Sequence, residues 1–218
     1  MIPKMIPKII HHIWVGPNSF PFEYVEFLNK WKLLYPDYNF IFWNNELVES
    51  MNIITDDIKK YYYSDCNIAL KADLLRFKIL EKFGGIYVDV DTEPLKRMPD
   101  EILNYSFFSG YQPNNEIAIG IMGSKVNESI VSFYINSVLE NIIKFTYNGK
   151  VSDEIWKISG PEFFTQFLTP YLNNPTYKFF EVKYFYPYAW WQMERKNEDF
   201  KTTSSEAYSV HHWAKTWG

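Results

Sequence analysis

Several features are scarce in this sequence, and each scarcity removes a class of protein. The 218 residues contain a single cysteine, Cys66, so no disulfide can form within the chain, which fits a reducing compartment. No run of about 18 or more apolar residues occurs, and the N-terminus lacks a charged segment followed by an apolar one. We therefore expect a soluble, cytoplasmic protein with no membrane segment in this chain.

Basic clusters and flexible linkers are also missing. Lys and Arg total 22 against 26 Asp and Glu, for a net charge of -4, and no block of basic residues offers an electrostatic footprint for nucleic acid. No Gly/Ser-rich or Pro-rich stretch divides the chain. We therefore expect one domain over residues 1–218 and no nucleic-acid partner. The oligomeric state leaves no mark on the sequence.

Aromatic residues, by contrast, are abundant. They make up 20% of the chain, with 8 Trp and 17 Tyr, which is more than a core alone usually uses. Stacking on flat bases or sugar rings is one use for such side chains. The clusters Tyr186-Pro187-Tyr188 and Trp190-Trp191 fit either a core or a surface for an acceptor molecule.

Hydrophobic periodicity predicts an alternation of strands and helices. A strand, a helix and a strand at the start of the chain indicate a right-handed parallel crossover, and His11 and His12 fall within the first strand. The fold class is therefore α/β. The expected strands cover residues 9–15, 38–43, 117–122 and 177–184, and the expected helices cover 22–35, short pieces of 45–63, 65–83, 128–143 and 161–168.

An acidic segment follows the clearest helix. Gly84 stands where a left-handed cap is wanted, and the apolar run that follows predicts a buried strand reaching Asp91. Alternation in that strand places Tyr87, Asp89 and Asp91 on one face. Two carboxylates at this spacing repel each other unless water or a hard divalent cation lies between them. The segment therefore predicts a metal site for a diphosphate.

The acidic segment is also compatible with two different roles. Asp89-Val90-Asp91-Thr92 matches the Asp-x-Asp-x-Thr pattern of haloacid-dehalogenase phosphatases, although that pattern usually opens a chain and needs a later Lys and a later acidic pair. A purely structural acidic strand end is the second of these roles. Upstream, Asp73 and Arg76 are three residues apart and therefore share a helix face, beside the apolar stripe. They form either a surface ion pair or a second wall of the same site.

Five short motifs occur in order along the chain: Ile6–Trp14, Lys71–Arg76, Gly84–Asp91, Ser159–Pro161 and His211–Trp217. Together they resemble the DXD-containing sugar transferases related to fungal Och1 mannosyltransferase, glycosyltransferase family 32, and more distantly the glucosylating domains of large clostridial toxins. The resemblance implies a GT-A fold with a Rossmann-like, mostly parallel mixed sheet flanked by helices. It also implies a nucleotide-sugar donor, a Mn²⁺ or Mg²⁺ ion and retention of anomeric configuration.

The resemblance also implies roles for individual residues. Trp14 would stack on the nucleotide base, unless it is a core aromatic. Asp73 would contact donor-sugar hydroxyls, and Arg76 would contact sugar or phosphate through its planar fork of donors. Asp89 would face the ribose and a metal-bound water, Asp91 would bind the metal directly, and Tyr87 either lines the pocket or packs. Catalysis is thus assigned to Asp73, Arg76, Asp89 and Asp91.

The C-terminal motif would complete the site. The resemblance implies one histidine as a further metal ligand. His211 and His212 face opposite ways in an extended segment, so only one can serve. The single-histidine versions of the family motif favour His211, and an ordinary packed or exposed histidine is the alternative for either one. Trp217 would close over the diphosphate. Where the family commonly has Gly-Ser, this chain has Lys215-Thr216, in which Thr216 can keep the hydroxyl contact and Lys215 adds a charge.

The function expected from the sequence is that of a retaining, metal-dependent hexosyltransferase. It would move a sugar from a nucleotide sugar, with UDP preferred and GDP-mannose as the other option, to a glycan or another hydroxyl acceptor. Synthesis of capsule, lipopolysaccharide or viral glycans would suit it. An inactive module that binds nucleotide sugars or glycans is the main alternative, ahead of the phosphatase.

Overall fold

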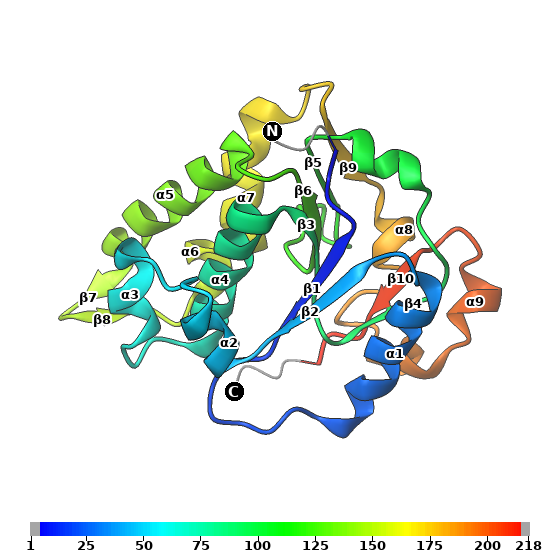
Figure 1. The fold of residues 1–218 in the computed structure, drawn as a ribbon, viewed down its shortest axis with the longest axis horizontal. Helices are drawn as coiled ribbons and strands as arrows, with labels where there is room; N and C mark the ends of the chain where they lie inside the picture. The colour runs from blue at the N-terminus through cyan, green and yellow to red at the C-terminus, as the bar shows by residue number, and fades with distance from the viewer. Residues whose placement is uncertain (1–4, 215–218) are drawn as a thin grey trace.

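A six-stranded mixed sheet forms the centre of the molecule (Figure 1). The computed structural model describes residues 5–214. Strand order is β2-β1-β3-β6-β5-β9, with parallel pairing of β2 with β1, β1 with β3, and β5 with β9, and antiparallel pairing around β6. The strands span Ile9–Ile13 (β1), Asn39–Trp43 (β2), Gly85–Val88 (β3), Phe107–Gly110 (β5), Ile121–Ser124 (β6) and Tyr177–Phe180 (β9). The expected mostly parallel mixed sheet is confirmed.

Helices cover both faces of this sheet. Figure 1 shows α3 to α7 on one side and α1, α8 and α9 on the other. The helices span Val25–Leu34 (α1), Asn45–Ser50 (α2), Asp56–Tyr62 (α3), Ile68–Phe83 (α4), Ser129–Lys144 (α5), Ile155–Ile158 (α6), Pro161–Leu168 (α7), Val182–Phe185 (α8) and Phe200–Thr203 (α9). Short 3-10 turns lie at Phe22–Tyr24, Asp100–Asn104, Thr169–Tyr171 and Met193–Asn197.

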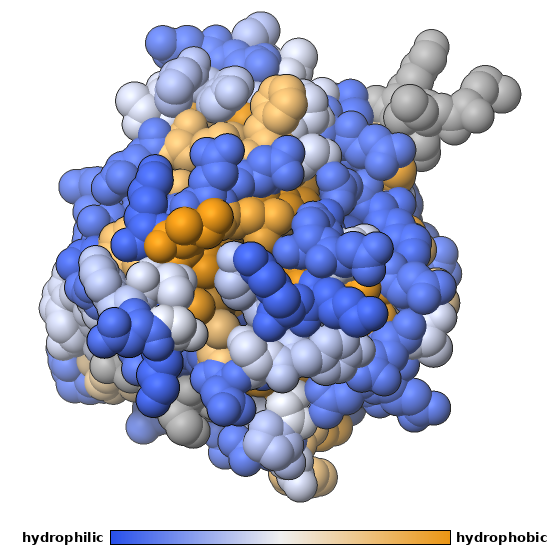
Figure 2. Space-filling view, turned by 90° about the vertical axis from the view of Figure 1, so that its left-hand side faces the viewer, coloured by the Kyte–Doolittle hydropathy of each residue, from blue (hydrophilic) through white to orange (hydrophobic). Residues whose placement is uncertain are grey.

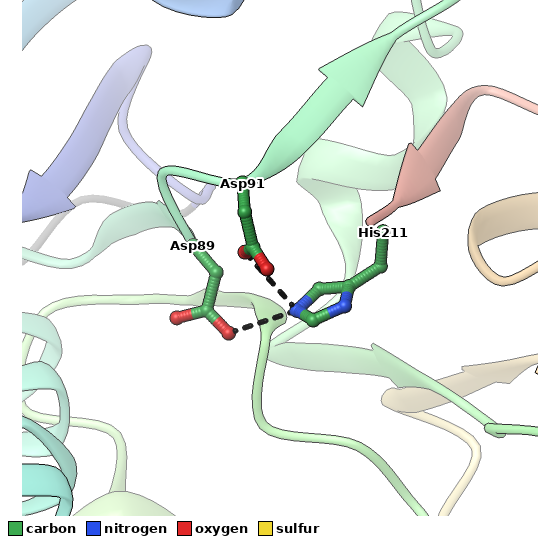
Figure 3. A group of neighbouring side chains, drawn as sticks. All are labelled: Asp89, Asp91 and His211. Atoms are coloured by element: carbon green, nitrogen blue, oxygen red, sulfur yellow. Dashed lines mark hydrogen bonds and ion pairs between the residues drawn. The ribbon is translucent and has the colours of Figure 1, made fainter. Parts of the chain in front are cut away.

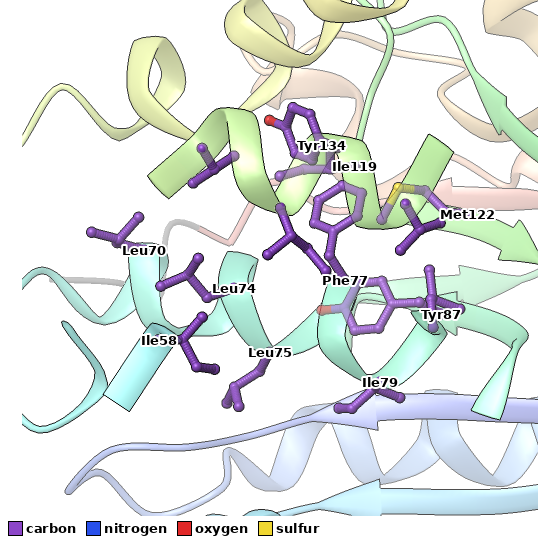
Figure 4. Close-up of a cluster of buried hydrophobic side chains, with 14 of the residues drawn as sticks. Ile58, Leu70, Leu74, Leu75, Phe77, Ile79, Tyr87, Ile119, Met122 and Tyr134 are labelled. Atoms are coloured by element: carbon purple, nitrogen blue, oxygen red, sulfur yellow. The ribbon is translucent and has the colours of Figure 1, made fainter. Parts of the chain in front are cut away.

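The two larger apolar clusters lie on opposite faces of strand β3, and a small third one contains Tyr188, Phe200 and Val210. Ile86 and Val88 pack with Trp31 of α1, whereas Tyr87 packs on the opposite face with α4 and α5. Figure 4 shows the second cluster, in which Phe77 lies between Tyr87 and Tyr134. This is the alternation expected for β3, and burial of apolar surface on both faces stabilises the central strand.

Two consecutive glycines connect α4 to β3. Gly84 has φ +61° and ψ -152°, and Gly85 has φ +91°. The predicted positive φ at Gly84 is therefore present, although its ψ lies outside the left-handed helical region, in a part of backbone space open essentially to glycine. A Cβ at Gly85 would lie 2.8 Å from the Ile9 carbonyl oxygen. The glycines thus let β3 begin directly after the helix, close against β1.

Some predicted boundaries were wrong. The acidic strand does not reach Asp91: β3 ends at Val88, and Asp89–Asp91 form a turn. The strand expected over 117–122 is β6, at Ile121–Ser124, and the one expected over 177–184 gives way to α8 after Phe180. Local patterns also missed β5 and the antiparallel pair of β4 (Thr92–Pro94) with β10 (Ser209–His211). A small hairpin joins β7 (Thr146–Tyr147) to β8 (Lys150–Val151).

The outer surface carries some apolar side chains but no candidate membrane span. Within residues 5–214, every helix is too short or too polar to cross a bilayer. Figure 2 shows apolar side chains gathered on the face that lies at the left of Figure 1, where α3, α5 and the β7–β8 hairpin are found. On α5, Phe133 and Ile143 are more than half exposed.

Candidate active site

The turn after β3 carries the two aspartates of the predicted metal site. The Thr92 amide donates to the Asp89 carbonyl at 3.1 Å and closes the turn, while the Asp89 amide donates to the Gly120 carbonyl at 2.8 Å. The chain then continues into β4. Because the turn is anchored on both sides, the two carboxylates are held at the end of a central strand. The turn, and not a common face of that strand as predicted, brings them together.

The pairing of β4 with β10 brings a histidine to these aspartates. Figure 3 shows His211 reaching toward both carboxylates, and its Nε2 lies 3.3 Å from Asp89 Oδ2 and 3.3 Å from Asp91 Oδ1. One ligand atom from each of the three residues lies within 4.8 Å of the others. His212 points elsewhere: its Nε2 is 3.1 Å from Glu93 Oε2 and its ring stacks on Phe27. The geometry therefore places His211, and not His212, in the acidic cluster.

A buried row of charges lies behind Asp89. Arg76 sits between two carboxylates, with Nη2 3.1 Å from Asp73 Oδ1 and Nη1 3.1 Å from Asp89 Oδ1. Asp73 and Arg76 are both buried, at 4% and 3% exposure, so of the two interpretations of their spacing the surface ion pair is wrong. They do not flank a stripe on α4, because that helix is enclosed by the sheet and by α3, α5 and α6.

Further hydrogen bonds fix the orientation of this row. The Tyr87 hydroxyl donates to Asp89 Oδ1 at 2.6 Å, and the Arg76 guanidinium lies over the Tyr87 ring, 4.6 Å from its centre. The Ser159 hydroxyl donates to Asp73 Oδ2 at 2.7 Å. Arg76 Nη1 also donates to the Ile119 carbonyl at 2.9 Å. Asp89 is thus positioned by partners on α4 and β3.

The pKa values show how the buried charges balance. Burial opposes ionisation of Asp89, but Arg76 and His211 hold its pKa below the usual value. Burial raises the pKa of Asp73 to about 7, against the opposing effects of Arg76 and Ser159. Burial also disfavours protonated His211, yet Asp91 and Asp89 outweigh it and raise its pKa. The two carboxylates thus stabilise a positive charge at the position of His211.

The segment after β10 folds over Asp91. The Ala214 amide donates to Asp91 Oδ2 at 2.9 Å, and the His212 amide donates to the Asp91 carbonyl at 3.0 Å. Trp213 has φ +53°, an uncommon conformation for a bulky residue, and its ring packs against His211 with centroids 4.5 Å apart. Such a strained residue beside an acidic cluster is typical of a functional site.

A cavity of about 800 Å³ opens in front of the cluster. Asp89, Asp91 and His211 line it together with Trp213 and Ala214. The other lining residues are Ile13, Val90, Gln112, Asn114, Glu116, Trp156, Pro161, Glu162 and Trp190. This volume suits a ligand of the size of a nucleotide sugar.

The structure does not bring every predicted residue into this lining. Tyr87 is 1% exposed and packs, while Trp14 lies one residue beyond the lining residue Ile13, with its Nε1 donating to the Asn18 carbonyl at 2.9 Å. Its role in base stacking stays a prediction. Thr216 and Trp217, as well as Lys215, lie outside the described residues.

Some residues of the site carry no clear signal in the sequence. Ser159 belongs to the Ser159–Pro161 motif and Trp213 to the His211–Trp217 motif. Nothing in the spacing of either motif indicates that Ser159 contacts Asp73 or that the Trp213 ring packs on His211. Gly120, which backs the cluster, has no local signal at all: a Cβ there would lie 2.8 Å from Asp89 Oδ2 and 3.3 Å from His211 Cδ2.

The donor set fits a divalent cation. Carboxylate oxygens are the ligands of Mg²⁺ and Mn²⁺, and an imidazole nitrogen is a common additional ligand for the transition metals. Asp89, Asp91 and His211 supply two oxygens and a nitrogen at the edge of an open cavity, so positions remain for ligand atoms. These residues can therefore hold Mn²⁺ or Mg²⁺.

Comparison with solved structures identifies the fold. The glycosyltransferase domain of the YGT toxin, solved with UDP bound, superposes with a TM-score of 0.60 at 10% sequence identity, over 81% of this chain and 80% of that one. At so low an identity the likeness concerns the fold alone. The fold is that of the GT-A glycosyltransferases.

Sequence comparisons lead to the family. Residues 21–108 match the model of the glycosyltransferase sugar-binding region containing the DXD motif. An uncharacterized glycosyltransferase of Acanthamoeba polyphaga mimivirus is 28% identical, over 84% of this chain and 74% of that protein. Inositol phosphoceramide mannosyltransferase 3 of Schizosaccharomyces pombe is 31% identical, over 66% of this chain and 39% of that protein.

The chain thus spans about two fifths of the length of the fission yeast relative. Toxin A of Clostridium novyi is 30% identical over half of this chain and 5% of that protein. The resemblance to Och1-like mannosyltransferases and to clostridial toxins is confirmed. Residues 21–108 of this chain thus match the DXD-containing sugar-binding region of glycosyltransferases.

Proposed function

We propose that this chain is a retaining, metal-dependent hexosyltransferase that takes a sugar from a nucleotide-sugar donor and passes it to a glycan or another hydroxyl acceptor. One observation carries the proposal: Asp89, Asp91 and His211 gather at the edge of an 800 Å³ cavity, with a buried arginine behind them.

The proposed metal site consists of Asp91, Asp89 and His211. A divalent cation held there would supply positive charge for the oxygens of a diphosphate leaving group. The Ala214 amide holds one oxygen of Asp91, and the Tyr87 hydroxyl holds one of Asp89, so each carboxylate presents its other oxygen in a defined direction. Mixed oxygen and nitrogen ligands favour Mn²⁺ over Mg²⁺.

Asp73 and Arg76 act as positioning residues in this proposal. Direct contact with donor sugar or phosphate, as expected from the resemblance, would require them to line the cavity, and neither does. Arg76 instead keeps Asp89 ionised and oriented, while Asp73 and Ser159 hold Arg76 in place from below. Removing Arg76 would leave buried carboxylates uncompensated, which is costly.

For retention, we propose a front-side reaction in which the acceptor hydroxyl enters on the face that the diphosphate leaves, with a phosphate oxygen as base. The alternative is a covalent glycosyl intermediate on Asp73. Asp73 is only 4% exposed, its Oδ1 is paired with Arg76 and its Oδ2 accepts a hydrogen bond from Ser159, all of which argue against that nucleophile. Anomeric analysis of the product tests retention, and a glycosyl adduct trapped on Asp73 would overturn the front-side scheme.

For the donor, we propose a UDP-sugar, with GDP-mannose as the other candidate. UDP is the nucleotide bound in the structurally similar toxin domain, whereas mannosyl transfer is the activity named for the fission yeast relative. The chain would suit synthesis of capsule, lipopolysaccharide or viral glycans, and one of its relatives is encoded by a virus.

The deciding experiment is nucleotide release from a panel of UDP-sugars and GDP-mannose with Mn²⁺. We expect release with at least one donor, loss of at least a hundredfold in Asp91→Ala, and parent activity in the control Asp65→Ala, which changes an exposed aspartate outside the cavity. Donor binding without release would indicate an inactive module. Release of phosphate from p-nitrophenyl phosphate, blocked in Asp89→Asn, would instead indicate the phosphatase.

A further inference from the structure

Part of the cavity wall lies away from the acidic cluster and is built from two segments that contact each other. A loop after β5 carries Gln112 and Glu116, whose side chains hydrogen-bond at 2.9 Å. The second segment is the pair of helices α6 and α7 with the turn between them: Trp156 lies on α6 and Glu162 on α7. All four residues line the cavity that also holds the acidic cluster. This wall, composed of these four side chains with Asn114, is called the outer wall below.

The outer wall, formed by a loop and by parts of α6 and α7, is held rigidly. The Ile117 amide donates to Thr165 Oγ1 at 2.7 Å, which ties the first segment to α7. Ser159 ties the second segment to Asp73 of α4. A Cβ at Gly160 would lie 2.6 Å from the Trp156 Cα, so this turn can pack only with glycine there. The wall is thus preorganised and linked to the buried charges behind the acidic cluster.

Trp156 is unusual within this rigid wall. Its side chain is 51% exposed, although its helix neighbours Ile155 and Ile158 are buried. A large aromatic surface left open inside a cavity is typical of a ligand contact, and its flat face suits a pyranose ring. Around it, amide and carboxylate groups offer hydrogen bonds to hydroxyls. The combination of one aromatic platform and several polar groups is that of a carbohydrate subsite.

The charge of the outer wall restricts which carbohydrate it can take. Glu116 and Glu162 carry carboxylates, and no Lys or Arg from the described part of the chain lines the cavity. An acceptor bearing a phosphate or carboxylate would meet like charge at this wall. Lys157, whose Nζ lies 5.9 Å from the centre of the Trp156 ring, does not line the cavity and is already paired with Glu154. We infer that the outer wall is the acceptor subsite and that it selects an uncharged sugar hydroxyl over a phosphorylated one. This inference rests on the proposed function and narrows its acceptor class.

The test compares neutral and phosphorylated acceptors with the donor that the panel selects. Methyl α-mannoside and methyl α-glucoside are set against mannose 1-phosphate and mannose 6-phosphate, whose charges lie at opposite ends of the ring, so that at most one blocks the acceptor hydroxyl. We expect a neutral glycoside to raise product formation at least tenfold above either phosphate. Equal or better use of both phosphates would overturn the inference.

Variants assign this preference to the outer wall. Trp156→Ala should raise the acceptor KM about tenfold. The double variant Glu116→Gln, Glu162→Gln should lower the ratio of product formed from neutral acceptors to product formed from phosphorylated ones about tenfold. The controls are Phe133→Ala, which removes a similarly exposed aromatic outside the cavity, and Glu140→Gln on the same helix. Variants indistinguishable from these controls would refute the assignment.

A binding measurement separates this inference from the proposed function. Saturation-transfer NMR reports contact of each sugar with the protein whether or not the sugar is glycosylated. A saturation signal from methyl mannoside that is lost in Trp156→Ala supports the acceptor subsite even if no donor is turned over, in which case only the proposed function fails. No signal from any neutral glycoside, or an equal signal from the phosphates, refutes the subsite.

Discussion

At the scale of single residues, Gly120 shows how closely the acidic cluster is packed. Its carbonyl accepts the Asp89 amide, and the space where its Cβ would be is bounded by Asp89 Oδ2 at 2.8 Å and by the Tyr186 hydroxyl at 3.1 Å. Its φ is not positive, so the need for glycine is one of space and not of backbone conformation. Any side chain here would push the Asp89 carboxylate toward the cavity.

We therefore predict that Gly120→Ala weakens Mn²⁺ binding by roughly ten- to hundredfold, the range typical when a residue that supports metal ligands is changed. Isothermal titration with Mn²⁺ measures the affinity. Gly149→Ala is the control: it places a side chain at φ +77° in the β7–β8 hairpin, where nothing lies within 4 Å of the new Cβ, so it should cost stability but leave Mn²⁺ affinity unchanged. Equal affinities in both variants would contradict the prediction.

The sequence indicates the charged residues of the site better than it indicates their surroundings. Asp73 and Arg76 can be found because their spacing and motif are local properties. Their burial cannot, because it depends on α3, α5 and α6 closing around α4, which no spacing within one helix reports. That burial changes their chemistry, since a solvent-exposed pair contributes little to stability whereas a buried one must be fully compensated.

At the scale of elements, the site depends on a strand pair between distant parts of the chain. Pairing of β10 with β4 sets His211 opposite Thr92, one residue after Asp91. Both strands are three residues long, too short for a reliable local pattern, so sequence could suggest a histidine ligand only through the family motif. The sequence also does not indicate the turn at Asp89–Asp91, because the alternation of apolar residues that is typical of β3 continues through Val90.

The contact between the α6–α7 turn and α4 yields a second prediction. Ser159→Ala leaves one oxygen of buried Asp73 without its donor, which should lower the free energy of unfolding by about 1–3 kcal/mol. Urea denaturation at pH 7.5 measures it. Because Ser159 also holds the segment that carries Trp156, acceptor KM should rise as well. Ser50→Ala, at an exposed helix end, is the control and should change stability by no more than about 0.5 kcal/mol. Equal stability of the two variants would show that the buried bond is dispensable.

At the scale of the whole molecule, two adjacent histidines of β1 are enclosed by the aromatic interior on opposite faces of the sheet. His11 lies beside Trp43 and Phe83, and His12 lies beside Trp31. Trp43 Nε1 donates to His11 Nδ1 at 3.1 Å, while His11 Nε2 lies 2.9 Å from the Gly84 carbonyl and donates to it. This arrangement needs neutral His11, because a proton on Nδ1 would displace the Trp43 hydrogen bond.

Protonation of these two histidines should therefore destabilise the fold before most carboxylates titrate. Burial lowers the pKa of His11 and of His12 from 6.5 to about 4, so the unfolded chain binds more protons between these values and stability is lost as pH falls through that window. From pH 7.5 to 5.0 the expected loss is about 2 kcal/mol for each histidine. Urea denaturation at both pH values measures it. The raised pKa of Asp73, about 7, works in the opposite direction but is common to both proteins, so the parent should lose about 2 kcal/mol more than His11→Gln over this pH range. An equal loss in parent and variant would show that protonation of His11 does not limit the stability of the fold in acid.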